Sequence, residues 1–234
     1  MSHKSIAIIP ARGGSKRIPK KNIKDFLGKP IIAYSIETAI KSKLFDEVMV
    51  STDDMQVAEI SKLLGAKIPF MRSKENSNDY AGTADVLVEV LKEYKNRNIN
   101  FDYCCCIYPT APFITPEKLK ESFELFKVKD YDSLFPVVKY SYPIQRSYKF
   151  LNDKISMVWP ENYSKRSQDL EQIYHDAGQF YWLKLEEFIK KKQIYNDNTG
   201  TIILSELEVQ DIDSEEDWKL AEMKFKLLKE SEKA

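Results

Sequence analysis

Short apolar runs alternate with amphipathic segments over the first 140 residues of the chain. The apolar runs are typical of strands that are buried on both faces of a sheet. The segments between them repeat apolar residues at helical spacing, and one such helix opens at Pro30, as proline prefers. The pattern predicts a parallel sheet with helices on both faces. The strands are expected at residues 5–10, 47–52, 67–71, 103–108 and 133–140, and the helices at 30–40, 55–64, 84–94 and 116–126.

This alternation stops after Tyr140. Residues 141–178 are rich in tyrosine, serine, glutamine, asparagine and charge, with scattered apolar side chains, and we interpret them as an inserted hairpin or arm. We therefore expect one domain over residues 1–234 that carries this arm. The alternation then resumes, with strands expected at 179–183, 201–204 and 209–212, a helix at 186–192, and a last helix from near Ser214.

Composition excludes several classes of protein. The 234 residues include 36 basic and 36 acidic side chains, and a net charge of zero argues against a protein that binds nucleic acids or membrane surfaces. No apolar run approaches the roughly 20 residues of a membrane span, and the N-terminal run is too short for a signal peptide. We expect a cytoplasmic chain. Its three adjacent cysteines, Cys104, Cys105 and Cys106, form no CxxC pair and are expected to be reduced thiols in a buried strand.

A basic glycine loop follows the first strand. Gly13 and Gly14 allow a sharp turn and a close approach of the backbone to a ligand. Five cations within ten residues surround them, and such a loop typically binds phosphate groups. The loop matches neither GxxxxGK[ST] nor GxGxxG, and a solvated basic loop or localisation signal is the alternative, which the preceding buried strand disfavours. The cations are Arg12, Lys16, Arg17, Lys20 and Lys21.

Ligands of parallel sheets bind at the carboxyl ends of the strands, so the loops after Pro10, Thr52, Met71 and Tyr108 should form the site.

Two acidic pairs could hold a metal ion. Asp211 and Asp213 alternate at the end of an expected strand, so both carboxylates should point to one side. Two hard oxygen ligands suit Mg²⁺, with water and phosphate completing its shell. The alternative is that Asp213 or Ser214 only caps the last helix. The rival pair is Asp53 and Asp54, of which Asp54 is expected to cap a helix.

Four motifs in collinear order resemble those of the CMP-sialic acid synthetases, the cytidylyltransferases that activate nonulosonic acids. The resemblance implies a three-layer α/β/α Rossmann-like nucleotidyltransferase fold, and an enzyme that transfers CMP from CTP to the sugar's anomeric hydroxyl and releases pyrophosphate. Mg²⁺ is the implied cofactor. Within the family, the sequence looks most like the bacterial members that act on pseudaminic acid. The motifs are IIPARGGSKRIPKKNI (8–23), STDD (51–54), YPTAPF (108–113) and DIDSEEDW (211–218).

The resemblance also implies which residues bind the nucleotide. Arg12 and Lys16 would clamp the triphosphate, and Lys21 would close the loop over the nucleotide; these three are the expected catalytic residues. An arginine after the third strand would read the base, although Arg72 could instead be a surface charge. Thr83, with Asp79 nearby, would lie near the nucleotide; the alternative is that Thr83 and Asp85 simply cap the following helix. The expected nucleotide-binding set is completed by Pro10, Ala11, Gly13, Gly14, Ser15, Asn22, Arg72, Asp79 and Thr83.

The sugar pocket is where the chain departs from relatives that activate N-acetylneuraminic acid. Tyr108 and Phe113 replace a glutamine and an arginine, and DAGQFY at 176–181 replaces an NGAIY pattern. Aromatic rings pack well against methyl and acylamino groups, which favours pseudaminic acid but fits legionaminic acid equally. Both residues could instead be core aromatics. The expected sugar contacts are Tyr108, Gln145, Arg146, Gln179 and Tyr181.

The arm should also mediate assembly. Its apolar residues need cover, and the resemblance implies a homodimer in which the arm lines the neighbour's sugar pocket. Arg146 would suit the sugar carboxylate, or would only make a surface ion pair. His175 is expected to be a solvent-facing arm residue rather than a catalytic base. Two other functions remain open: a nucleotide-sugar-binding protein without turnover, and a nucleic-acid binder, which the neutral charge disfavours.

Overall fold

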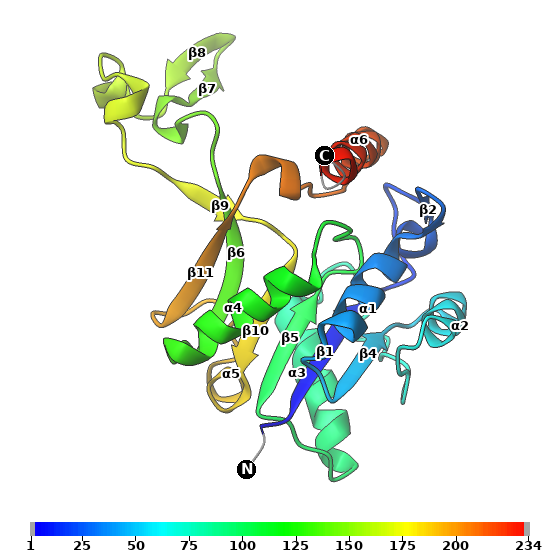
Figure 1. The fold of residues 1–234 in the computed structure, drawn as a ribbon. Coiled ribbons are helices and arrows are strands. Elements are labelled where there is room, and N and C mark those ends of the chain that lie inside the picture. Colours follow the sequence, from blue (N-terminus) through cyan, green and yellow to red (C-terminus); the bar gives the residue numbers. More distant parts are fainter. Residues whose placement is uncertain (1–2, 232–234) are drawn as a thin grey trace.

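A seven-stranded mixed sheet forms the centre of the computed structural model, which describes residues 3–231 (Figure 1). The strand order is β11-β6-β10-β5-β1-β4, and β9 pairs with β6. Five strands share one direction, whereas β9 and β10 run antiparallel to their neighbours. The strands are β1 (Ser5–Pro10), β4 (Glu47–Ser51), β5 (Tyr103–Ile107), β6 (Ser133–Lys139), β9 (Tyr174–Asp176), β10 (Phe180–Lys184) and β11 (Thr199–Leu204).

Helices cover both faces of this sheet, so the predicted three-layer architecture is confirmed. On one face, buried side chains of α1 (Ile31–Ser42), α2 (Met55–Leu63) and α4 (Pro116–Val128) share a cluster with Ala7 and Ile9 of β1. On the other, α3 (Thr83–Asn96) and α5 (Leu185–Lys191) pack with Ile6 and Ile8. The last helix, α6 (Glu215–Ser231), packs against the short β2–β3 hairpin (Asp25–Phe26 and Lys29–Pro30).

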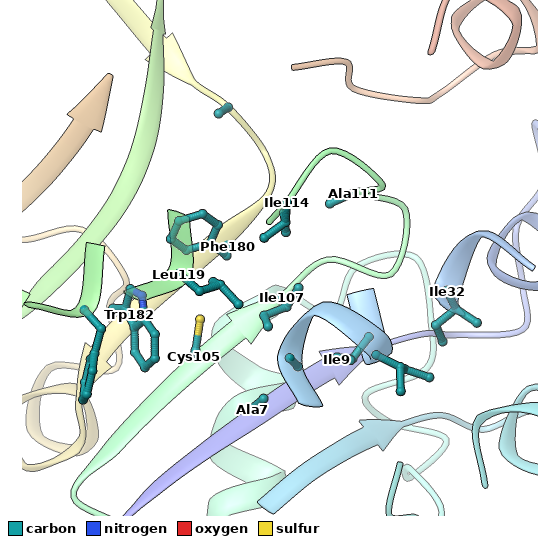
Figure 2. Close-up of a cluster of buried hydrophobic side chains, with 14 of the residues drawn as sticks. Ala7, Ile9, Ile32, Cys105, Ile107, Ala111, Ile114, Leu119, Phe180 and Trp182 are labelled. Carbon is teal, nitrogen blue, oxygen red and sulfur yellow. The ribbon is translucent and has the colours of Figure 1, made fainter. Parts of the chain in front are cut away.

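The three cysteines alternate between these two layers. Cys105 belongs to the cluster with Leu119 and Trp182, as Figure 2 shows, whereas Cys104 and Cys106 face α3. All three are fully buried and none is in a disulfide. The interpretation as small hydrophobic side chains in a buried strand is therefore confirmed.

Two expected strands do not form in the described part of the chain, and a third runs antiparallel to its neighbours. The strand expected at 67–71 is reduced to one bridge between Lys67 and Met49, because Pro69 lacks the N–H that a ladder needs. The segment 209–212 pairs with no strand in the part of the chain described. Val209 and Ile212 are buried in different clusters, so their spacing reflects burial rather than pairing. The third, β10, forms as expected but runs antiparallel between β5 and β6.

The segment 141–178 contains the expected hairpin. Strands β7 (Tyr148–Leu151) and β8 (Lys154–Met157) pair only with each other, outside the main sheet, and the arm projects away from it (Figure 1). Asn152 and Asp153 both have positive φ, at 48° and 60°, as the tight turns that join twisted strands require. Apolar side chains of the arm are widely exposed: Tyr142, Tyr148, Phe150, Leu151, Ile155 and Tyr163.

The structure also confirms that Asp54 caps a helix. Its Oδ1 accepts hydrogen bonds from the backbone N–H groups of Gln56 (2.7 Å) and Val57 (3.0 Å) at the start of α2. We expect Asp54→Ala to lower the free energy of unfolding by about 1 kcal/mol, because two helix donors lose their acceptor. Chemical denaturation measures this change. Glu59→Ala, at an exposed position of the same helix, is the control, and equal losses in the two variants would contradict the capping role.

Candidate active site

A pocket of about 430 Å³ opens at the carboxyl ends of β1 and β5, at the sheet edge where the site was expected. The loops after β1 and β5, the segment between α2 and α3, the start of α3 and the segment before α6 contribute to its wall. The loop after Thr52, which was also expected at the site, does not line the pocket. Eleven of the residues expected to bind nucleotide, sugar or metal line it: Pro10, Arg12, Ser15, Lys16, Lys21, Asn22, Arg72, Asp79, Thr83, Tyr108 and Asp213. The remaining lining residues are Arg17, Ala81, Val86, Pro109 and Thr110.

The loop after β1 turns tightly against the loop after β4. The N–H of Gly13 donates to Oδ1 of Asp53 at 2.9 Å. A Cβ atom added to Gly13 would lie 2.7 Å from Oδ2 of Asp54, closer than packed atoms tolerate, so this position requires glycine. A Cβ on Gly14 would meet no atom within 4 Å. Of the two glycines, only Gly13 is required by a close approach, and Asp53 supports the loop.

Two cations of the loop share one carboxylate. Arg12 donates to Oδ1 of Asp79 at 2.7 Å, and Lys16 donates to Oδ2 at 2.5 Å. Arg12 also donates to the carbonyl oxygen of Asn78 at 3.1 Å. Lys16 and Arg12 together lower the pKa of Asp79 below its ordinary value. Both cations are thus positioned to bind an anion in the pocket.

Lys21 and Asn22 hold the far end of the loop. The Nδ2 of Asn22, which is buried, donates to the carbonyl oxygen of Arg12 at 2.9 Å. Lys21 donates to the carbonyl oxygen of Ile212 at 2.7 Å and lies 3.6 Å from Asp213. Arg17 donates to the same Asp213 carboxylate at 2.7 Å. The loop is therefore tied to the segment that precedes α6.

Arg72 is a buried residue of the pocket rather than a surface charge, with 8% of its area exposed. Its Nε donates to Oγ of Ser51 at 3.0 Å, and its Nη2 donates to the carbonyl oxygen of Ser51. Burial lowers the pKa of Arg72, and the charge of Asp53 opposes this shift. The end of β4 thus fixes a guanidinium group inside the pocket.

Thr83 lies at the start of α3 but does not cap it. The carboxylate of Asp85 accepts the N–H of Gly82 at 3.1 Å, so Asp85 serves that end of the helix. The Oγ1 of Thr83 instead lies 3.1 Å from Oη of Tyr108. Both residues line the pocket, so a hydroxyl pair forms part of its wall.

Comparison with known proteins agrees with this geometry. The sequence profile of a family described as "Cytidylyltransferase" matches residues 6–233. The chain belongs to the cytidylyltransferase family. It is 42% identical to the pseudaminic acid cytidylyltransferase of Campylobacter jejuni subsp. jejuni serotype O:2, over 97% of this chain and 99% of that protein. It is 32% identical to the CMP-N,N'-diacetyllegionaminic acid synthase of Legionella pneumophila, over 97% and 98% of the two chains.

The fold of this cytidylyltransferase is shared with a solved structure of CMP:2-keto-3-deoxy-manno-octonic acid synthetase complexed with CTP. The two superpose with a TM-score of 0.70 at 20% sequence identity, over 97% of this chain and 99% of the other. This similarity confirms the Rossmann-like nucleotidyltransferase fold. No helix between residues 3 and 231 has both the length and the apolar character that crossing a membrane requires.

Several expected site residues of the cytidylyltransferase lie outside the pocket wall. Tyr181 is buried behind Tyr108, with ring centroids 5.3 Å apart. Gln179 is also buried, and its Nε2 donates to the carbonyl oxygen of Glu208 at 2.6 Å. Ala11, Gly13 and Gly14 shape the loop without lining the pocket. Phe113, weighed above as a sugar contact or a core residue, packs in the cluster around α6.

The arm residues are also separate from this pocket. Gln145 donates from Nε2 to the carbonyl oxygen of Glu171 at 2.9 Å and lines a separate hollow of about 250 Å³ within the arm. Arg146 is exposed in a short 3-10 turn, Ile144–Arg146. His175, expected in the arm, lies instead on β9 of the main sheet, opposite Val138 of β6. Its ring centroid is 4.8 Å from that of Tyr140, and it does not line the pocket. Within one chain, the fold therefore brings neither Gln145 nor Arg146 to the pocket.

The structure places only one member of the acidic pair in the pocket wall. Asp213 lines the pocket, whereas Asp211 does not. Loss of hydration, together with the nearby charge of Asp213, raises the pKa of Asp211. Ser214, not Asp213, caps α6, since its Oγ accepts the N–H of Asp217 at 3.2 Å. Within residues 3–231, no group of three or more histidine, cysteine or acidic side chains could by itself hold a metal ion.

Five pocket residues were not predicted as site residues. Arg17 could have been predicted from the sequence, because it belongs to the same cation-dense loop as Lys16. Pro109 and Thr110 fall inside the YPTAPF motif, which was quoted without assigning them a role. Ala81 and Val86 have no chemical signal in the sequence, since small and aliphatic residues are common at every kind of position.

Proposed function

We propose that this cytidylyltransferase transfers CMP from CTP to the anomeric hydroxyl of a nonulosonic acid, most readily pseudaminic acid, and releases pyrophosphate. The observation that carries the proposal is the pocket itself, in which four cations of one loop face a buried arginine and a hydroxyl pair. Relatives with this reaction in their names match nearly the full chain. Such a site suits a nucleotide with a charged phosphate tail at one end and a polar base at the other.

The basic loop would bind the triphosphate. Phosphoryl transfer depends mainly on positioning and on neutralising charge, because no covalent intermediate with the protein is required. Arg12 and Lys16, which both line the pocket, would contact the phosphate oxygens. Lys21 would close this end of the pocket, since it already bridges the loop to Ile212.

The other end of the pocket would hold the cytidine. Pro10 is the last residue of β1 and Ala11 follows it, so their carbonyl groups could meet the edge of the base. Arg72 would donate to an oxygen or ring nitrogen of cytosine from its fixed position against Ser51. Thr83 lies within the same wall and would add a polar contact.

The sugar would occupy the pocket next to Tyr108. Burial raises the pKa of this tyrosine, so it would meet the sugar as a neutral phenol. Its ring would pack against the methyl or acylamino groups that distinguish pseudaminic acid. The 42% identity to a pseudaminic acid cytidylyltransferase, against 32% to the legionaminic acid enzyme, supports this choice.

The carboxylates of Asp211 and Asp213 fit a divalent cation. They are hard oxygen donors, and loss of hydration, together with the nearby charge of Asp213, raises the pKa of Asp211; a bound cation would stabilise its ionised form. With only two protein ligands, Mg²⁺ would keep waters and phosphate oxygens in its shell, as it prefers. Bound there, the ion would neutralise charge on the phosphates, while Arg17 and Lys21 hold the Asp213 carboxylate in place.

A substrate panel tests the proposed function. Purified protein is incubated with CTP, Mg²⁺ and pseudaminic, legionaminic or N-acetylneuraminic acid, and pyrophosphate release is measured. We expect the largest kcat/KM with pseudaminic acid. A larger value with legionaminic acid would overturn the choice of sugar but not the reaction. If CTP binds but no pyrophosphate is released with any of the three sugars, the result would favour the alternative, a nucleotide-sugar-binding protein without turnover.

We further propose a homodimer that forms through the arm, residues 141–178. The hairpin β7–β8 exposes Phe150 at 86%, although burying such a side chain favours association by about 2 kcal/mol. We expect light scattering at micromolar concentration to give twice the mass of one chain, and Phe150→Asp to shift it toward the monomer. Leu63→Asp, at a position 88% exposed on α2, is the matched control. A wild-type monomer would exclude this assembly.

In that dimer, the partner's arm would bring Gln145 and Arg146 to the sugar. A guanidinium group pairs with a carboxylate through two parallel hydrogen bonds, and nonulosonic acids carry a carboxylate. We expect Arg146→Ala to raise the KM for the sugar about tenfold and to leave the KM for CTP unchanged. Steady-state kinetics with each substrate varied in turn measures both constants. An unchanged sugar KM would remove Arg146 from the pocket.

A further inference from the structure

A carboxylate outside the pocket wall holds the loop that follows Arg72. Glu89 of α3 accepts the backbone N–H of Ser73 through Oε1 at 2.7 Å, and the hydroxyl of Ser73 through Oε2 at 2.9 Å. The same Oε2 accepts Nδ2 of Asn76. Arg72 lines the pocket, whereas Glu89 does not. One side chain of α3 thus holds the chain at the residue next to the buried arginine.

Arg72 is therefore fixed from two sides. On one side, its backbone N–H donates to the carbonyl oxygen of Thr52 at 2.8 Å, and its guanidinium group donates to Ser51. On the other side, residues 73–82 form neither helix nor strand, so the hydrogen bonds to Glu89 replace those of a regular element. Within residues 3–231, Nη1 of Arg72 makes no hydrogen bond, so it is available to a ligand in the pocket.

The charge of Glu89 suits this arrangement. Loss of hydration opposes its ionisation, but the hydrogen bonds from Ser73 and Asn76 and the charge of Arg72 outweigh that cost and lower the pKa of Glu89. Loss of hydration also lowers the pKa of Arg72, and the charges of Asp53 and Glu89 oppose this shift. Glu89 therefore accepts three hydrogen bonds from the loop and stabilises the charged form of the buried guanidinium group.

We propose that Glu89 is a positioning residue: by holding Ser73 and Asn76 against α3, it places the guanidinium group of Arg72 for contact with the base of the nucleotide. The inference rests on the proposed function, which assigns Arg72 to cytosine. Its effect is confined to one end of the ligand. CTP occupies both the base end and the phosphate end of the pocket, whereas inorganic tripolyphosphate contacts only the cations of the basic loop. Loss of the contact should weaken the binding of CTP and spare that of tripolyphosphate.

An exchange of hydrogen-bonding partners tests the proposal. Glu89→Gln replaces one of two acceptor oxygens by a donor, and Asn76→Asp sets two carboxylates against each other. The double variant restores the contact with reversed polarity and keeps one negative charge there, because the new amide can donate to the new carboxylate. Glu93→Gln, one turn further along α3, is the matched control, since its carboxylate pairs with Arg97 at 2.6 Å. Calorimetry on the full chain measures CTP and tripolyphosphate in the same Mg²⁺-containing buffer.

We expect each single variant to raise the Kd for CTP about tenfold and that for tripolyphosphate less than about twofold, because a small misplacement of a binding group is costly. The double variant should return to within about threefold of the wild type, because the two changes are coupled. Glu93→Gln should match the wild type. In steady-state kinetics, the single variants should raise the KM for CTP and leave kcat unchanged, as loss of binding common to the ground and transition states requires.

Equal increases in the Kd of both ligands, single variants that leave CTP affinity unchanged, or no CTP binding to the wild type would overturn the proposal. So would a double variant that is folded, as thermal unfolding shows, but does not recover CTP binding. If the double variant does not fold, Asn76→Ala decides, because it removes the same hydrogen bond without adding a carboxylate and should weaken only CTP. If CTP binds in the expected pattern but no sugar is converted, the proposed function fails and the role of Glu89 stands.

Discussion

Arg12→Ala and Lys16→Ala are each expected to lower kcat/KM at least about 10²-fold without unfolding the protein. Charge develops on the phosphates during transfer, and removing one positioned donor from such a site commonly costs about 10²–10³-fold. Both side chains already point at one anionic group, the carboxylate of Asp79. Pyrophosphate release at varied CTP concentration measures the loss, and thermal unfolding checks the fold.

A control for this experiment lies in the same loop. Lys20 donates to Oε1 of Gln56 at 2.8 Å and does not line the pocket. Lys20→Ala therefore removes one charge from the loop but no contact with the phosphates, and it should retain nearly all activity. If Lys16→Ala were as active as Lys20→Ala, then Lys16 would not belong to the phosphate-binding set.

Asp211→Asn and Asp213→Asn are expected to lower Mg²⁺-dependent kcat/KM at least about tenfold. Removing even an indirect partner of a metal ligand typically costs about 10–100-fold, so loss of a ligand should cost no less. The concentration of Mg²⁺ that gives half-maximal activity should rise, because an amide binds the ion more weakly than a carboxylate. Activity measured over a Mg²⁺ titration gives both quantities.

Asp53→Asn is the comparison for the acidic pair. Asp53 accepts the N–H of Gly13, and the carbonyl oxygen of an asparagine can keep that hydrogen bond. This variant should therefore lose less activity than either change at Asp211 or Asp213. Complete loss of activity in Asp53→Asn, with Asp211→Asn active, would show that the metal binds at the other acidic pair.

The predictable parts of the fold are those with a local cause. Apolar periodicity located α3 and α4 to within two residues at each end, and the proline and glycine signals marked the start of α1 and the end of α2. The direction of β10 was not predictable, because pairing between β5 and β6 depends on where the arm returns the chain. Strand 67–71 was lost because one proline outweighed its neighbours' β propensity.

The site follows the same division. The loop around Gly13 and Lys16 was predictable, since its residues are consecutive and its motif is long. The position of Tyr181 behind Tyr108, rather than in the pocket wall, was not, because period two along β10 does not show which neighbour covers a side chain. Whether Gln145 and Arg146 reach a sugar pocket depends on a second chain, so neither the sequence nor the structure of one subunit determines it.

The contact of Asp79 with Arg12 and Lys16 has a consequence for turnover. The carboxylate of Asp79 belongs to the same chain, so it competes with a ligand for Arg12 and Lys16 at a high effective concentration. A ligand displaces it only if the ligand carries more negative charge. A triphosphate has that charge, whereas the single phosphodiester of a CMP-sugar has little of it. Once pyrophosphate has left, Asp79 can again form ion pairs with Arg12 and Lys16. We expect these ion pairs, which weaken the binding of anions with little charge, to favour release of the CMP-sugar.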